Sequence, residues 1–177
     1  MKKLLSFFLA GAFLFSFNHT LLAQQTTFRI SYDVSLFDLT GNMIQDSNDD
    51  FVFTGTDFAG SVTKINPSGN LVWSRSISSG FFNQLNDIIE VSPANGGGYL
   101  VAGDNVLIRL TSSGNLVWAQ DYDMPDISGS KESSLNFNEV LESNDGNFLV
   151  AGSVRYFWDG TSSSTADTSH CFAMKVN

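Results

Sequence analysis

Short runs of apolar residues alternate with turns rich in Gly, Asn, Asp and Ser along most of this chain. The stretch Tyr99–Asp121 shows the pattern best, because it holds three such runs and close copies of its first and last runs occur elsewhere. The last run and its turn recur after a step of 45 residues: Gly69, Asn70 and Trp73 are followed by Gly114, Asn115 and Trp118. Short apolar runs bounded by turn residues predict β-strands joined by hairpins.

Each copy of the pattern predicts four strands, here called a to d. Strand a is predicted at Met43–Ser47, Asp87–Ser92 and Asn138–Ser143, and strand b at Phe51–Gly55, Tyr99–Gly103 and Phe148–Gly152. Strand c is predicted at Ser61–Asn66, Asn105–Thr111 and Cys171–Asn177, and strand d at Leu71–Ile77 and Leu116–Tyr122. Four strands in a repeat of this length are typical of a β-propeller blade. We therefore predict an all-β fold, a propeller-type array of about three four-stranded antiparallel blades.

The two ends of the chain carry unequal parts of the repeat. Thr27–Asp33 stands where a d strand would stand before the first copy, and the third copy stops at Asn177 without a d strand. Closed propellers have four to eight blades. We therefore expect an incomplete ring, with missing C-terminal blades and a longer protein of which this is the N-terminal portion. The alternative is a three-bladed ring in which Thr27–Asp33 pairs with Phe172–Val176.

The first 23 residues have the plan of a signal peptide. A basic start is followed by the apolar run Leu4–Phe17 and by a small residue, Ala23, before a predicted cut. The run is too short for a permanent membrane span, which needs about 20 residues. We expect residues 1–23 to be removed, leaving 24–177 as one repeat domain, exported to the medium or the cell surface and without a membrane span.

Charge and composition narrow the classes of partner. The formal net charge is −9, and no Lys/Arg cluster follows the predicted signal peptide, which argues against a nucleic-acid surface. The single cysteine, Cys171, cannot form an internal disulfide, and its place in strand c predicts a buried small hydrophobe. Strand b, apolar throughout, predicts a strand covered on both faces. Trp73 and Trp118 are predicted to be buried at equivalent places between blades.

The quoted motifs resemble those of known proteins. The order Gly-Tyr/Phe-Leu-Val-Ala-Gly, an apolar-basic strand and Ser-Gly-Asn-Leu-Val-Trp resembles the repeats of secreted bacterial propeller proteins, many of them exported by the type IX route. Gly-x-x-x-Trp, ending at Trp73 and Trp118, is similar to the tryptophan-docking repeat of quinoprotein propellers. The resemblance covers nearly all of residues 24–177, although the sorting domain usual at the C terminus of such secreted proteins does not occur in this sequence.

Repeat arrays offer extended surfaces, which favours a binding, adhesion or scaffold module. The resemblance to quinoprotein propellers implies an alternative: a quinoprotein-like or other secreted enzyme whose catalytic part lies outside this chain. The residues themselves add nothing to the enzyme class, because His170 is the only histidine after the signal peptide and no nucleophile motif surrounds it. We therefore expect a binding module rather than an enzyme, with no catalytic residues in this chain.

Candidate ligand residues gather at one end of the predicted strands. In an antiparallel meander the b–c and d–a connections share an end, and both long insertions, Tyr122–Ser134 and Ser153–His170, belong to them. Aromatic rings beside a carboxylate suit a glycan or a protein ligand. The ligand hypothesis names four residues in the second insertion: Tyr156, Phe157, Trp158 and Asp159. The alternative is that Tyr156–Trp158 continues strand b and packs inward.

A weaker hypothesis concerns calcium. Asp121, Asp123 and Asp126 form an acidic cluster, and Ca²⁺ prefers several oxygen ligands. The spacing lacks the pattern and the glycine of an EF-hand loop. The alternative is a solvated acidic turn. No other cofactor is expected.

Overall fold

The computed structural model describes residues 39–56, 60–77, 84–124, 132–157 and 168–177. Within them the chain forms eleven β-strands and one 3-10 turn, η1 (Pro93–Asn95). The strands are β1 (Leu39–Gln45), β2 (Phe51–Thr56), β3 (Ser61–Ile65), β4 (Leu71–Ser76), β5 (Leu85–Glu90), β6 (Tyr99–Gly103), β7 (Val106–Leu110), β8 (Leu116–Asp121), β9 (Glu132–Glu142), β10 (Phe148–Phe157) and β11 (Thr168–Val176). The predicted signal peptide and Thr27–Asp33 lie outside the described residues. No described helix is long and apolar enough to cross a membrane.

The strands form three antiparallel meanders, so the all-β prediction is confirmed. The first sheet has the order β1-β2-β3-β4, the second β5-β6-β7-β8 and the third β9-β10-β11. These are the predicted orders abcd, abcd and abc, and most boundaries agree to within two residues. The third sheet differs in length, because β9 and β10 extend about five residues beyond the ends of their equivalents β5 and β6.

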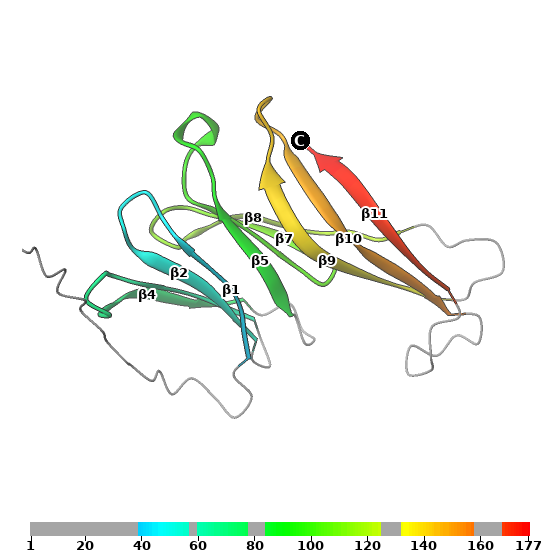
Figure 1. Ribbon diagram of the computed structural model, residues 1–177, viewed down its shortest axis with the longest axis horizontal. Coiled ribbons are helices and arrows are strands. Elements are labelled where there is room, and N and C mark those ends of the chain that lie inside the picture. Colours follow the sequence, from blue (N-terminus) through cyan, green and yellow to red (C-terminus); the bar gives the residue numbers. More distant parts are fainter. Residues whose placement is uncertain (1–38, 57–59, 78–83, 125–131, 158–167) are drawn as a thin grey trace, which may run out of the picture.

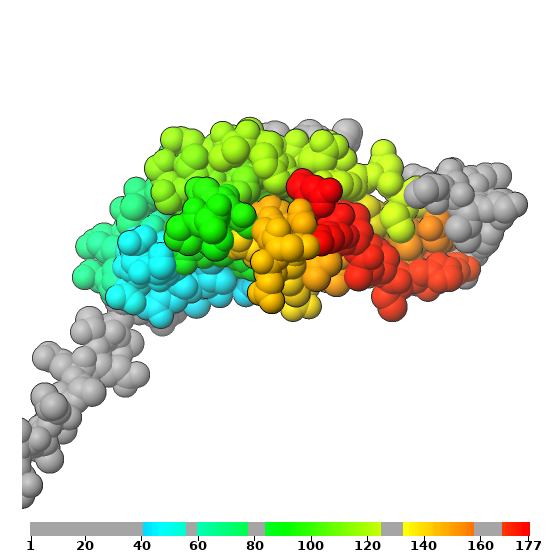
Figure 2. Space-filling model, turned by 90° about the horizontal axis from the view of Figure 1, so that it is seen from above, coloured from blue at the N-terminus to red at the C-terminus, as the bar shows by residue number. Residues whose placement is uncertain are grey.

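The three sheets stack side by side, with the first strand of each sheet next to the first strand of its neighbour. β5 contacts β1 on one side and β9 on the other, as Figure 1 shows. Seen from above in Figure 2, the turns that follow β1, β5 and β9 form a row, coloured cyan, green and gold. The described sheets form an open stack, in which the first and third lie on opposite sides of the second.

Two apolar layers hold this stack together. One lies between the first and second sheets and includes Val62, Trp73 and Ile88. The other lies between the second and third sheets and includes Leu100 and Phe137. All five residues of β6 are buried, whereas buried and less buried residues alternate at the start of β10. Strand b is therefore covered on both faces in the second sheet only.

Trp73 is buried, as predicted, by docking on the next sheet. Its ring lies against Gly114 in the β7–β8 turn, where a Cβ atom would come within 2.8 Å of the ring. Gly114 also has φ +76°, a conformation that glycine adopts without strain. The indole N–H of Trp73 donates to the carbonyl of Ser112 at 3.2 Å. Trp118 was also predicted to be buried, but it is only half-buried.

The prediction that Cys171 is buried is wrong. β11 is paired on one side only among the described strands, and its side chains alternate. Phe172, Met174 and Val176 pack towards the second sheet. Cys171 points to the other face and is exposed. A place in strand c therefore did not determine burial, because burial also needs a neighbouring sheet.

Candidate functional site

A polar pocket of about 360 Å³ opens at the end of the stack where the b–c and d–a connections lie. Its walls come from the β6–β7 turn, from the residues after β8 and from the first half of β9. Its lining residues are Asp104, Asn105, Asp123, Met124, Ser133, Ser134, Leu135 and Asn136. Six of these eight side chains carry a carboxylate, an amide or a hydroxyl. This pocket lies at the end at which the sequence predicted binding, but with mostly different residues.

The β6–β7 turn places the first carboxylate of the pocket. Gly103 pairs with Val106, so Asp104 and Asn105 alone form the turn. Asp104 has φ +31°, in the region where Asp and Asn are found more often than other non-glycine residues. Its carbonyl accepts a hydrogen bond from the Phe137 N–H at 2.5 Å, which ties the turn to β9. Its carboxylate accepts from the Gln84 N–H at 3.1 Å.

Burial sets the electrostatics of this carboxylate. It raises the pKa of Asp104, and the Gln84 N–H opposes that rise only in part. A half-buried carboxylate with a raised pKa, in a cleft and on a strained turn, is a frequent feature of binding sites. The turn therefore combines a positive φ, a carboxylate with a raised pKa and a place in the pocket wall.

Other polar groups of the pocket are partly engaged with its walls. The Asn105 side chain donates to the Tyr122 carbonyl at 3.2 Å, and the Asn136 side chain accepts from Asn86 at 2.8 Å. In contrast, Asp123 and Ser134 are exposed and have no hydrogen-bond partner in the described part of the chain. These two side chains are free to bind a ligand, while the others hold the shape of the pocket.

The structure does not place Asp121 and Asp123, two of the three aspartates of the calcium hypothesis, in the same cavity. Asp121 is exposed and lines a different cavity, between β4 and the second sheet, whereas Asp123 lines the polar pocket. Asp126 lies outside the described residues. Among the residues that the structure describes, no three His, Cys, Asp or Glu side chains form a group that suits a metal ion. Calcium binding at this cluster therefore stays a prediction.

The aromatic residues of the ligand hypothesis are placed differently from the expectation. Tyr156 and Phe157 are 5% and 3% exposed, because β10 continues to Phe157 and stays paired with β9. The Tyr156 ring packs edge-on against His170, with ring centroids 5.9 Å apart. Exposed rings at these two positions are therefore ruled out, and the inward-packing alternative holds for them. Trp158 and Asp159 lie outside the described residues.

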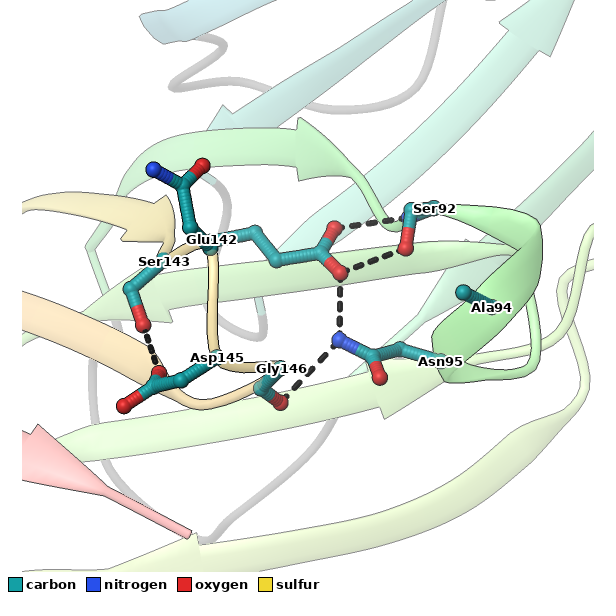
Figure 3. A pocket seen from close by; sticks show the side chains of 8 residues that line it. Ser92, Ala94, Asn95, Glu142, Ser143, Asp145 and Gly146 are labelled. Atoms are coloured by element: carbon teal, nitrogen blue, oxygen red, sulfur yellow. Dashed lines mark hydrogen bonds between the residues drawn. The ribbon is translucent and has the colours of Figure 1, made fainter.

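A second pocket, of about 490 Å³, lies at the opposite end, between the second and third sheets. In it the Glu142 carboxylate accepts from the Ser92 N–H at 2.7 Å, from the Ser92 hydroxyl at 2.6 Å and from Asn95 (Figure 3). Burial opposes ionisation of Glu142, but these hydrogen bonds outweigh it and lower its pKa. Glu90 accepts the same two bonds from Ser47 between the first and second sheets. The same pair of hydrogen bonds therefore joins the sheets at both junctions, and we assign Glu142 this structural role rather than a role in binding.

A cluster of charged side chains lies between the first two sheets. The Lys64 ammonium lies 2.7 Å from Asp46 and 2.9 Å from Asp50, and the Tyr99 hydroxyl donates to Asp46 at 2.6 Å. Burial opposes the charges of Asp46 and Lys64, but the mutual hydrogen bonds lower the pKa of Asp46 and raise that of Lys64. Burial, and then the bond to Asp46, raise the pKa of Tyr99 to about 12. Because the Lys64 and Asp46 side chains are only 6% and 0% exposed, we assign this cluster to the joining of the two sheets.

The sequence missed Asp104, Ser133, Ser134 and Asn136 as pocket residues. The Asp104-Asn105 pair carried a usable signal, since it is a polar pair between two largely apolar strands. The residues on β9 carried none, because nothing in the sequence showed that β9 continues beyond its equivalents. No protein-family model and no curated protein matches this chain.

Proposed function

We propose that this protein is an exported binding module of the β-propeller type, which holds a glycan in the polar pocket between the second and third sheets. The observation that carries the proposal is the place of the pocket. The carboxylates that recur between sheets, Glu90 and Glu142, accept hydrogen bonds from serine residues of the neighbouring sheet and so join the sheets. Asp104 and Asp123 lie at the end of the stack where β9 and β10 are longer than the equivalent strands of the other sheets. The repeat therefore does not account for these two carboxylates.

The chemistry of the lining favours sugar hydroxyls over other ligands. Carboxylate and amide oxygens accept hydrogen bonds from hydroxyls, while the Asn amides and Ser hydroxyls donate to sugar oxygens. A pocket of about 360 Å³ is within the usual range for small-molecule sites, roughly 300–1,000 Å³. None of its described lining residues is Arg or Lys, which argues against phosphate. The propeller-type fold is supported by the stacked four-stranded meanders and by the docking of Trp73 on the next sheet.

A glycan array probed with the full chain tests the proposal. We expect binding to at least one glycan class, weakened tenfold or more by Asp123→Ala, because that carboxylate is exposed in the pocket and free to accept hydrogen bonds. Asp121→Ala is the matched control, since Asp121 lies two residues away, is also exposed and lines another cavity. Failure to bind any glycan, or equal loss in both variants, would contradict the proposal. Repeating the array with a chelator tests the calcium hypothesis separately.

A further inference from the structure

The cavity between β4 and the second sheet is a groove of about 380 Å³. Its floor is apolar and consists of Val106, Ile108 and Leu110 of β7, which are all buried. Leu116 and Ala119 of β8 also line the groove, yet both of these residues are exposed. The first sheet therefore covers β7 but leaves β8 open, and an apolar groove remains between the two sheets.

The pairing of β8 with β7 decides which β8 side chains face this groove. Ala119 pairs with Ile108, and directly paired residues lie on the same face of a sheet. Ile108 belongs to the apolar layer between the first and second sheets. Gln120 instead pairs with Leu107, which belongs to the layer between the second and third sheets. A substitution at position 119 therefore changes the groove, whereas the same substitution at position 120 changes the other face.

Two charged side chains that have no ion-pair partner in the described part of the chain line this groove. The Arg75 guanidinium donates from Nε to the Gly114 carbonyl at 3.0 Å, just before the start of β8. It also donates to the carbonyls of Ser74 and Ser113, which leaves some of its N–H donors unused among the described residues. Asp121 ends β8, and its carboxylate accepts no hydrogen bond from a described residue. The groove therefore presents a cation near the start of β8 and a carboxylate at its end.

The two strands that border the groove both have an open edge. β4 comes last in the order β1-β2-β3-β4, and β8 comes last in the order β5-β6-β7-β8. Among the described strands, each is therefore paired on one side only, and an edge of this kind accepts an extended chain. β8 has six residues, which corresponds to about 20 Å of extended chain. The groove thus suits a short extended segment, whose backbone also needs hydrogen-bond partners.

We propose that this groove binds an extended peptide segment of another protein, with two apolar side chains on the β7 floor and opposite charges at the two ends. Side chains at alternate positions of an extended chain point to the same side, so one side of the peptide reaches the floor and both ends. An acidic side chain pairs with Arg75 and a basic side chain with Asp121. A fatty acid matches the groove less well, because it has one charged group and no backbone donors for the strand edges. No described residue lines both this groove and the polar pocket, so the site is independent of the proposed glycan site.

Fluorescence anisotropy with a labelled heptapeptide and the full chain tests the proposal. The probe, Glu-Thr-Leu-Thr-Val-Thr-Lys with blocked ends, carries its two charges and its two apolar side chains at alternate positions. We expect saturable binding that Ala119→Glu weakens at least tenfold, because the new carboxylate stands in the apolar groove. Gln120→Glu is the matched control, since it adds the same charge on the other face of β8 and should leave the affinity unchanged. Both positions are exposed, so neither substitution disturbs the core.

Two further comparisons test the charges and the kind of ligand. A probe with Met in place of its Lys should bind the native chain about threefold more weakly than the original probe, since exposed ion pairs contribute little. The two probes should bind Asp121→Asn equally, because the carboxylate is gone. A probe that does not bind, equal losses in Ala119→Glu and Gln120→Glu, or the same preference for Lys in Asp121→Asn would each overturn the proposal. Displacement of the probe by a lower concentration of oleate, kept below micelle formation, would also overturn it, in favour of an acyl chain.

Discussion

The junction between the first two sheets and the outer face of the third contain the same residue types in different surroundings. Lys64 and Lys175 occupy equivalent places, and each binds an aspartate of the turn before strand b in its own sheet. Lys64 is buried under the second sheet and also donates to Tyr99, whereas Lys175 is exposed. The position in the repeat thus decides which residue is present, and the neighbouring sheet decides what that residue contributes.

The two tryptophans should show the largest difference between these regions. Trp73→Ala removes a docked ring and its hydrogen bond, and we expect a loss of about 4 kcal/mol in the free energy of unfolding. Trp118→Ala removes a half-buried ring with less to lose, about 1–2 kcal/mol. Urea denaturation of both variants measures the two losses. Equal losses would show that Trp118 is docked in solution as fully as Trp73 is.

Two glycine substitutions provide a control for the docking itself. Gly114→Ala combines a positive φ with a contact of 2.8 Å to the Trp73 ring. Gly97→Ala has a positive φ but no atom within 4 Å of the added Cβ. Gly114→Ala should therefore cost about 1–3 kcal/mol more than Gly97→Ala. A similar cost for both would mean that the ring does not rest on Gly114.

The lysines should differ in the same direction. Lys64→Met keeps most of the side-chain volume but leaves Asp46 and Asp50 without their cation, and we expect a loss of about 3 kcal/mol. Lys175→Met removes an exposed pair with Asp145, and we expect no measurable change in denaturation, since solvent screens such pairs. A neutral Lys64→Met would contradict the structural role given to the buried cluster.

The sequence predicted the positions of the strands well, but it predicted the burial of individual side chains poorly. Strand positions followed from apolar runs and turn residues, which are local signals, and the order within each sheet followed from short connections. Burial of Trp118 and Cys171 was mispredicted, because burial depends on the neighbouring sheet: the described third sheet covers Trp118 only in part, and no described sheet covers Cys171. For Tyr156 and Phe157 the sequence left a ligand role and inward packing open, because the added length of β10 has no local signal that separates it from a loop insertion. Asp104 was missed because its properties arise from packing against Gln84 and β9.

The smallest expected effect is on the free energy of unfolding at alkaline pH. The pKa of Tyr99 is raised to about 12 in the folded protein, against about 10 in an unfolded chain, so the folded state holds this proton more tightly. Stability from this group is therefore complete below about pH 10 and is lost as the pH rises towards about 12. Tyr99→Phe should cost about 1–2 kcal/mol at neutral pH, since it removes one hydrogen bond to Asp46. The difference between the two proteins should shrink between about pH 10 and pH 12, while Lys64, whose pKa is also raised, loses part of its own contribution towards the top of this range in both proteins. Unfolding free energies measured across this range decide the point: a difference that does not change with pH would place the Tyr99 hydroxyl outside the cluster, and the first junction would then differ from the outer face of the third sheet by packing alone.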